Sequence, residues 1–360
     1  MKVLHIISSM YRGGRERQLA TIYKFSSNKD VVNQILIFNK KKDDYINEYG
    51  INSDDVFYLT EKQFFNRLIE IKSIITKREP DIIYTWGSFE FLFCFLLNPF
   101  IKQRVINGSI RHGKVEFNKK HISRFFLLQL SKYIVANSKA GLRANKLRRG
   151  YVLYNGIDNK FLNIPPEEKS SVKVNSILKQ YTNETIFISV ANLVPVKDYF
   201  TTLRALKEIK DRGHNFFYIV IGEGQMRNQL EEETEKLNLT KEVNFIGRKV
   251  NVIDYLQISD VFIHSSKGEG CSNAILEAMA LSLPIIATDT GGTNEIMGNT
   301  NGELFPYQDV EELTNSIERL ISDKEQLIIK GIESKSIVLK NFTVEKMIIN
   351  YVSILKKLEE

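Results

Sequence analysis

Short runs of β-branched and aromatic residues alternate with amphipathic stretches along almost the whole chain of 360 residues. The clearest runs lie at 3–7, 34–38, 82–85, 133–136, 186–191, 217–221 and 261–264. Helical periodicity fills the intervals between them, as over 64–77 and 139–147. Strands separated by helices favour parallel sheets covered by helices on both faces. Because 360 residues exceed what one core usually supports, the pattern predicts an α/β protein with two doubly wound domains.

The polar segment 163–184 interrupts this alternation and contains Pro165-Pro166 together with several charges. Such composition is typical of a linker between domains. We therefore predict a first domain over 1–164 and a second over 165–342. Residues 343–360 have helical periodicity, and we expect them to form a helix that crosses back to the first domain.

Charge divides unevenly between the two predicted domains. Residues 1–164 carry 28 Lys and Arg against 14 Asp and Glu, a balance of +14, whereas the remainder has a balance of −7. This asymmetry indicates an anionic partner for the first domain: a membrane surface, a phosphate-bearing acceptor or nucleic acid. A merely solvated basic surface is the alternative. We do not expect nucleic acid, because no recognised binding module is present.

Other features favour a cytoplasmic protein. Two cysteines, Cys94 and Cys271, are too few for a disulfide framework. The chain begins with a five-residue strand pattern rather than a secretory signal. Its longest apolar run, 91–97, is far too short to span a membrane. No Cys and His cluster has metal-ligand spacing, so we expect no metal site.

The segment His264–Met297 reads HSSKGEGCSNAILEAMALSLPIIATDTGGTNEIM and carries two carboxylates, Glu269 and Glu277, eight residues apart. A glycine-rich turn precedes a predicted helix that Ser272 or Asn273 can cap. Backbone N–H groups at such a helix N-terminus suit a phosphate or a polar sugar face. One carboxylate is then placed to bind a sugar and the other a ribose. A capped core helix with a solvated Glu277 explains the spacing equally well.

Four further loops follow predicted strands, where ligands bind in open parallel sheets. Gly13 and Gly14 in SSMYRGGR allow a phosphate to approach the backbone closely. Lys197 in ANLVPVKD precedes a helix and is suited to a diphosphate. Gly222 belongs to a Gly-x-Gly pair without the third glycine of a dinucleotide fingerprint, and Arg248 ends the last loop, FIGR. Each signal alone is weak, and ordinary strand-to-helix turns remain the alternative.

In this order the pieces resemble the retaining GT-B enzymes of glycosyltransferase family 4, also called glycosyl transferases group 1. The resemblance spans nearly the whole chain and is strongest over 186–305. It implies two Rossmann-like domains that face each other across a cleft. The matching pieces are Gly13-Gly14, Ala136-Asn137-Ser138, 154–158 (YNGID), Asn192 with Lys197, Gly222-x-Gly224, 245–247 (FIG), Glu269 with Glu277, and 288–292 (TDTGG).

The resemblance also implies a role for each matching residue. Glu277 would hold the ribose hydroxyls of a nucleotide-sugar, and Lys197 would bind the diphosphate and stabilise the leaving group. Arg248 would border the base, Gly222 would contact the nucleotide, and the first domain would approach the phosphates with its glycine pair. The hydroxyls of the transferred sugar would be held by Glu269 and by the backbone of Gly270, Cys271, Ser272 and Asn273.

Two further positions bear on catalysis. His112 matches a position where the family often has a histidine near the sugar, although an ordinary loop histidine explains it as well. His264 has no motif support. Asn192 departs from the family pattern, which commonly has a cation there, so only Lys197 remains in that loop. This departure leaves open a noncatalytic member or an arginine supplied from elsewhere.

The implied reaction is transfer with retained anomeric configuration, by a front-face route in which the departing phosphate helps to deprotonate the acceptor. The chain contains no Asp-x-Asp motif, so we expect neither a metal nor any other cofactor. The expected donor carries a hexose or N-acetylhexosamine on UDP, with GDP second. A sugar-nucleotide epimerase of the same fold and a noncatalytic nucleotide-sugar-binding subunit are the alternatives.

The acceptor expected from the resemblance is a glycan or a lipid-linked oligosaccharide in bacterial surface-polysaccharide synthesis. Segment 114–130 pairs cations with an apolar stripe, as surface-lying membrane helices do, and 89–100 is rich in aromatics. Both features favour peripheral contact of the basic first domain with anionic lipid on the inner face of the cell membrane. A helix that faces the core explains 114–130 equally well.

Overall fold

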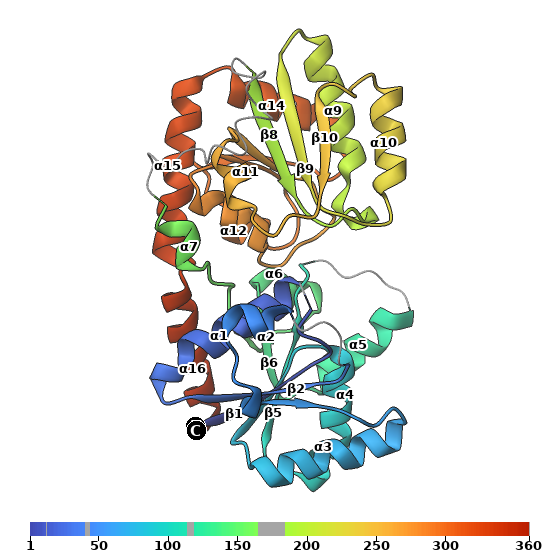
Figure 1. Ribbon diagram of the computed structural model, residues 1–360, viewed down its shortest axis with the longest axis vertical. Helices are drawn as coiled ribbons and strands as arrows, with labels where there is room; N and C mark the ends of the chain where they lie inside the picture. Colours follow the sequence, from blue (N-terminus) through green and yellow to red (C-terminus); the bar gives the residue numbers. More distant parts are fainter. Residues whose placement is uncertain (12, 40–43, 114–118, 165–183, 360) are drawn as a thin grey trace. The chain divides into compact units, whose positions relative to one another are not determined.

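The structure is a computed structural model that describes residues 1–11, 13–39, 44–113, 119–164 and 184–359. Contacts divide the chain into two compact units, Met1–Gly156 with Val344–Glu360, and Ile157–Thr343. Each unit has one parallel sheet with helices packed against it (Figure 1). The predicted class, two doubly wound α/β domains, is confirmed.

The sheet of the first unit has seven strands in the order β3-β2-β1-β4-β5-β6-β7. The order reverses between β1 and β4, which pair in parallel from Val3↔Ile82 to Ile6↔Thr85. The strands are β1 (Lys2–Ile7), β2 (Val32–Ile37), β3 (Val56–Tyr58), β4 (Ile82–Thr85), β5 (Arg104–Ile110), β6 (Tyr133–Ala136) and β7 (Tyr151–Val152). The helices are α1 (Gly14–Ser26), α2 (Asp44–Tyr49), α3 (Phe64–Arg78), α4 (Ser88–Leu97), α5 (Lys119–Leu130), α6 (Lys139–Ala144) and α16 (Val344–Glu359).

Alternate residues of β1 supply the cores on its two faces, because successive side chains of a strand point to opposite sides. Val3 and Ile7 join a cluster with residues of α1 and α16. Leu4 and Ile6 join a second cluster with residues of α3 and α4. All four side chains have no exposed surface. The first and the last helix of the chain therefore share one face of this sheet.

The sheet of the second unit has six strands in the order β10-β9-β8-β11-β12-β13, with its reversal between β8 and β11. The strands are β8 (Thr185–Val190), β9 (Phe216–Ile221), β10 (Val243–Gly247), β11 (Val261–His264), β12 (Ile285–Thr288) and β13 (Gly302–Phe305). The helices are α7 (Asn159–Leu162), α9 (Tyr199–Asp211), α10 (Arg227–Lys236), α11 (Ile253–Gln257), α12 (Asn273–Ala280), α13 (Thr293–Ile296), α14 (Val310–Ile321) and α15 (Lys324–Asn341).

Helices α9, α10 and α14 share a core with one face of this sheet, to which β11 contributes Val261 and Ile263. Phe262 and His264 alternate with them, so their side chains point to the opposite face. Both are buried, and their rings stack with an interplanar angle of 12°. The last residue of β11 thus places a buried imidazole at the carboxyl edge of the sheet.

Three details differ from the sequence predictions. The units divide at Gly156 rather than at 164, because α7 packs on α12 of the second unit. The sequence missed β13, whose four residues include a glycine and a glutamate that weaken the strand pattern. Ile164 and Glu184 flank residues 165–183, so most of the predicted linker lies outside the described residues.

Candidate functional site

The loops that follow β8 and β11 meet at the reversal of strand order in the second unit. Ligands in doubly wound sheets bind beyond the carboxyl ends of the two strands at this point. Lys197 follows β8, and Glu269 follows β11. Although 72 residues apart in sequence, the Lys197 ammonium donates to Glu269 Oε1. The structure therefore brings together two of the three predicted catalytic residues.

The Lys197 side of the site is a short turn followed by a helix. A single 3₁₀ turn, Pro195–Lys197, ends at Asp198, which has a positive φ of 28° and stands at the N-cap of α9. Asp198 accepts the Thr201 hydroxyl at 2.8 Å, and its carbonyl accepts the Ser265 hydroxyl at 2.7 Å. These bonds tie the turn to the loop after β11 and so position the Lys197 backbone.

The Glu269 side is held by the loop after β12. Ser266 N–H donates to Thr288 Oγ1 at 3.0 Å, and Thr290 Oγ1 donates to the Ser266 carbonyl at 2.8 Å. The Gly292 N–H donates to the Glu269 carbonyl at 2.8 Å. The TDTGG segment, singled out by sequence without a role, is therefore a support for the Glu269 backbone.

The charges in the site act strongly on Glu269. Burial raises the pKa of this carboxyl, but the Lys197 ammonium and His264 together lower it well below the ordinary value. Glu269 is therefore ionised in this arrangement and acts as an acceptor. The side chains of Lys197 and Glu269 are each 17% exposed, so the pair is partly buried but still reaches solvent.

His264 is the site residue that sequence reasoning missed. Its side chain is buried, and its Nε2 atom lies 3.6 Å from Glu269 Oε1. Burial, and then the Lys197 charge, lower the pKa of His264. A histidine at the end of a β-branched strand, five residues before the predicted catalytic glutamate, was the available signal.

The helix after Glu269 starts as predicted, with Ser272 at the N-cap of α12, although its side chain makes no capping bond. Glu277 is only 4% exposed, so the alternative of a solvated Glu277 is wrong. Gly270, Cys271 and Ser272 are also buried. Asn273, the first residue of the helix, is half-buried. Glu277 thus lies in the interior of the second unit, eight residues along the chain from Glu269.

The two loops next to the Lys197 turn touch through their backbones. Gly222, with φ of 156°, lies against the Ala191 carbonyl so closely that a Cβ would collide with it. The Leu193 N–H donates to the Glu223 carbonyl at 3.0 Å. Asn192 and Arg248 are both exposed. The structure therefore joins the Asn192 and Gly222 loops, whereas Arg248 has an exposed side chain at the end of β10.

In the first unit, the predicted glycine pair begins α1 directly after β1. Gly13 is the N-cap, and a Cβ there would collide with the carboxylate of buried Glu16. Arg15 donates to Glu16 at 2.9 Å and to Ser8 Oγ at 2.8 Å. The chain's own carboxylate therefore occupies the α1 N-terminus, which the sequence assigned to a phosphate.

A similar arrangement follows β4. Gly87 is the N-cap of α4, and a Cβ at this position would collide with the carboxylate of Glu90. Burial raises the pKa of Glu90. His112, the third predicted catalytic residue, follows the neighbouring strand β5 and is exposed.

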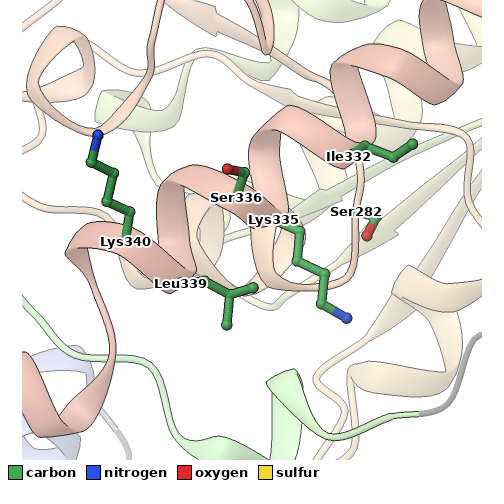
Figure 2. A pocket seen from close by; sticks show the side chains of 6 residues that line it. All are labelled: Ser282, Ile332, Lys335, Ser336, Leu339 and Lys340. Atoms are coloured by element: carbon green, nitrogen blue, oxygen red, sulfur yellow. The ribbon is translucent and has the colours of Figure 1, made fainter.

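A shallow surface pocket of about 520 Å³ lies elsewhere in the second unit. Figure 2 shows its lining on α15 and on the turn after α12. It is lined by Ser282, Ile332, Lys335, Ser336, Leu339 and Lys340, none of which is a predicted site residue. Among the described residues, no group of three or more His, Cys, Asp or Glu side chains is placed to hold a metal ion. No helix in the described ranges is long and apolar enough to cross a membrane.

Comparison with known proteins bears on this site. Residues 173–331, which include Lys197, Glu269 and Glu277, match the sequence profile of the family described as Glycosyl transferases group 1. The matched residues lie within the second unit. Proteins that are similar to this chain are named as glycosyltransferases.

Two curated relatives illustrate the range of this glycosyltransferase family. The uncharacterized glycosyltransferase MJ1059 of Methanocaldococcus jannaschii is 25% identical over 254 residues, which cover 65% of this chain and 62% of MJ1059. The UDP-Gal:alpha-D-GlcNAc-diphosphoundecaprenol alpha-1,3-galactosyltransferase of Escherichia coli is 30% identical over 178 residues. That match covers 48% of this chain and 45% of the relative. The chain thus aligns with less than two thirds of either relative's length.

The fold matches over its full length. Anabaena Alr3699/HepE, solved in complex with UDP-glucose, superposes with a TM-score of 0.85 and covers 99% of both chains at 21% identity. Two Rossmann-like α/β domains, as in GT-B structures, are therefore the architecture of this chain.

Proposed function

We propose that the chain is a retaining, metal-independent enzyme of glycosyltransferase family 4 that uses a nucleotide-sugar donor. The observation that carries this proposal is the meeting of Lys197 and Glu269 at the strand-order reversal of the second unit. This place in a doubly wound sheet is where nucleotides bind. The Lys197 ammonium is suited to bind a diphosphate, and the neighbouring Glu269 carboxylate is suited to bind sugar hydroxyls.

The proposed mechanism assigns one task to each group. Lys197 turns its ammonium to the diphosphate and stabilises the charge that develops on the leaving phosphate. Glu269 accepts hydrogen bonds from hydroxyls of the transferred sugar, since it is ionised, and Glu277 accepts them from the ribose. The bond from the anomeric carbon to the phosphate breaks as the bond to the acceptor oxygen forms on the same face. The departing phosphate takes the acceptor's proton.

The proposed donor carries a hexose or N-acetylhexosamine on UDP, with GDP second. The name of the E. coli relative specifies UDP-Gal, and HepE was solved with UDP-glucose. Because position 192 is an asparagine, Lys197 is the cation of the loop ANLVPVKD. The exposed amide of Asn192 is a neutral hydrogen-bond donor to the same diphosphate.

The proposed acceptor is a glycan or a lipid-linked oligosaccharide of bacterial surface-polysaccharide synthesis, reached at an anionic membrane surface. The E. coli relative is named for a diphosphoundecaprenol-linked acceptor. Ile122, Phe126 and Leu130 on α5 are 47%, 61% and 59% exposed, so this apolar stripe faces outward rather than into the core. Phe89 and Phe100 are also exposed, at 52% and 67%. Exposed aromatics on a basic domain are suited to peripheral contact with anionic lipid.

Thermal unfolding of the full chain with UDP, GDP, ADP and CMP, each with and without EDTA, tests the donor site. A ligand at a hundred times its Kd stabilises by about 2.7 kcal/mol. We expect a selective shift with one diphosphate that EDTA does not change. No shift with any nucleotide would contradict the proposed donor site, and a shift that EDTA abolishes would contradict metal independence.

Product analysis with the matching nucleotide-sugars then tests the reaction. We expect the sugar to move to a polyprenyl-diphosphate-linked saccharide with its anomeric configuration retained, as NMR of the product shows. Inversion would contradict the front-face route. Epimerised sugar released without any acceptor would identify an epimerase, and tight donor binding without turnover would identify a noncatalytic subunit.

A further inference from the structure

His264 is buried next to the proposed donor site but has no hydrogen-bond partner at its Nε2 atom. This atom is among the buried side-chain atoms without a partner and faces Glu269 Oε1 at 3.6 Å. A buried polar atom left without a hydrogen bond costs stability, so its retention calls for an explanation. Phe262 stacks on one face of the ring, with centroids 6.1 Å apart. The imidazole therefore has a fixed orientation toward the carboxylate.

Glu269 lies between a cation and this imidazole. Lys197, on the turn before α9, donates to the same Oε1 atom that His264 approaches, and Ser266 Oγ is 3.5 Å from it. Among the described residues, Lys197 and Glu269 are the two charged groups that act on His264. The ammonium disfavours a proton on the imidazole, whereas the carboxylate favours it. In the ligand-free arrangement, burial and then the Lys197 ammonium keep the pKa of His264 below its ordinary value.

A donor diphosphate changes this balance. The diphosphate attracts the Lys197 ammonium, so Glu269 loses its paired cation. It also neutralises the positive charge near His264, and this charge had opposed protonation of the imidazole. An ionised carboxylate that is partly buried needs a replacement donor. His264 is the group in position to supply it, once its Nε2 atom carries a hydrogen and the distance of 3.6 Å shortens.

We propose that His264 is a positioning residue that takes up a proton when the donor diphosphate engages Lys197, and then holds Glu269 in place for the sugar. The proton comes from solvent, and no covalent bond changes. This inference rests on the proposed role of Lys197 in donor binding. It makes donor affinity pH-dependent through a residue that does not itself touch the reacting atoms.

The first test is calorimetric titration of the full chain with UDP, or with GDP if UDP does not bind, in buffers of different ionisation enthalpy. We expect uptake of up to about one proton per site between the free-state and bound-state titration midpoints of His264. Between these midpoints, Kd should rise by up to about tenfold per pH unit, and above the bound-state midpoint it should no longer change with pH. Binding without proton uptake would overturn the proposal.

Two variants identify the residue that takes up the proton. His264→Gln retains a donor near Glu269 but cannot titrate, so the nucleotide should still bind while proton uptake disappears. His214→Gln is the matched control, because His214 also faces a glutamate, Glu318, at 3.3 Å but lies outside the site. Uptake should persist in the control. Undiminished uptake in His264→Gln, or in His264→Asn if the first variant does not fold, would overturn the proposal.

An experiment without nucleotide distinguishes failure of this inference from failure of the proposed function. NMR titration of the His264 ring in the wild type and in Lys197→Gln measures the effect of the ammonium directly. Removing the positive charge should raise the midpoint, and an unchanged midpoint would overturn the inference even if nucleotides bind. A raised midpoint in a chain that binds no nucleoside diphosphate would instead contradict the proposed donor site.

Discussion

Lys197 and Glu269 neutralise each other in the ligand-free chain, and the proposed donor must displace one from the other. A pair that is 17% exposed on each side retains access to solvent, so this exchange needs no unfolding of the site. Glu269 stays ionised, because the Lys197 ammonium and His264 together outweigh the effect of burial on its pKa. This pair of residues therefore sets the ionisation of Glu269 and leaves Lys197 accessible to an anionic ligand.

Lys197→Ala should reduce kcat by about a hundredfold or more, with a smaller effect on donor affinity, if the ammonium acts mainly on the charge that develops in the transition state. Steady-state kinetics with the donor, together with calorimetric Kd values, separate the two effects. Lys207→Ala is the control, since Lys207 pairs with Asp211 on the surface of α9. Equal losses in turnover and affinity would contradict this role and indicate uniform diphosphate binding.

Glu277→Ala should weaken nucleotide binding by about 1.5–3 kcal/mol, because charge-assisted hydrogen bonds to the ribose would be lost. Calorimetry against the nucleoside diphosphate measures the change. Because Glu277 is buried, Glu277→Gln serves as a variant of the same shape. Glu232→Ala, at an exposed position of α10, is the surface control. An unchanged Kd in both Glu277 variants would remove this residue from the donor site.

At the scale of elements, a buried polar cluster joins α16 to the first sheet. Trp86 Nε1 donates to His5 Nδ1 at 3.1 Å, and Asn33 Oδ1 lies 3.0 Å from His5 Nε2. Tyr351 of α16 donates to the same Asn33 oxygen at 3.0 Å. Because Trp86 can only donate, Nδ1 is an acceptor, and the neutral ring carries its hydrogen on Nε2. A proton on Nδ1 would break the Trp86 bond, so the cluster requires a neutral His5.

Acid should therefore destabilise the first unit through His5. Burial lowers the pKa of His5 to about 4, against a small opposing effect of Asn33. The unfolded chain binds the proton first, so stability is fully present above about pH 6.5 and falls toward pH 4, by up to about 3 kcal/mol. Denaturant unfolding as a function of pH measures this slope. His5→Gln should flatten it, whereas an unchanged slope in that variant would assign the effect to other groups.

The exposed apolar stripe of α5 leads to a prediction about membrane binding. Phe126→Ser combined with Leu130→Ser should reduce co-sedimentation with vesicles rich in phosphatidylglycerol at least severalfold, because two exposed apolar side chains are lost. Ile328→Ser is the matched control, since Ile328 is 65% exposed on α15 of the other unit. Equal binding by the double variant and the wild type would contradict membrane contact through α5.

At the scale of the whole molecule, the last helix of the chain, α16, belongs to the first unit. The core of the first unit therefore contains residues from both ends of the sequence. Seven buried side chains of α16 contribute: Val344, Met347, Ile348, Tyr351, Ile354, Leu355 and Leu358. Unit two is continuous in sequence, from Ile157 to Thr343. Stability of the two units therefore depends on different parts of the chain.

Truncation after Thr343 should unfold or strongly destabilise the first unit while leaving the second folded. The loss of seven buried side chains exceeds the usual stability of a single domain, at about 1.5–3 kcal/mol for each large apolar one. Calorimetric scanning should show one transition in place of two, and the matching nucleoside diphosphate should still raise the remaining one. A truncated chain that retains both transitions would contradict the structural role of α16.

The local patterns of the sequence determined the fold class and nominated the residues of the proposed site. Period-two and period-3.6 hydrophobicity identified parallel sheets with covering helices, because these periods follow from backbone geometry alone. Lys197, Glu269 and Glu277 were predicted from their place in loops after strands and from the family resemblance, and their roles stay predictions. The same local signals could not show that the Glu16 carboxylate lies against Gly13 at the α1 N-terminus.

Tertiary structure decided everything that depends on which strands are neighbours. The order β8-β11 brings Lys197 to Glu269 across 72 residues, and the burial of β11 turns His264 from an unmarked histidine into a partner of the site. Burial likewise showed that Glu277 is interior and that the α5 stripe is exposed. These properties arise from contacts between segments far apart in sequence, where periodicity and spacing carry no information.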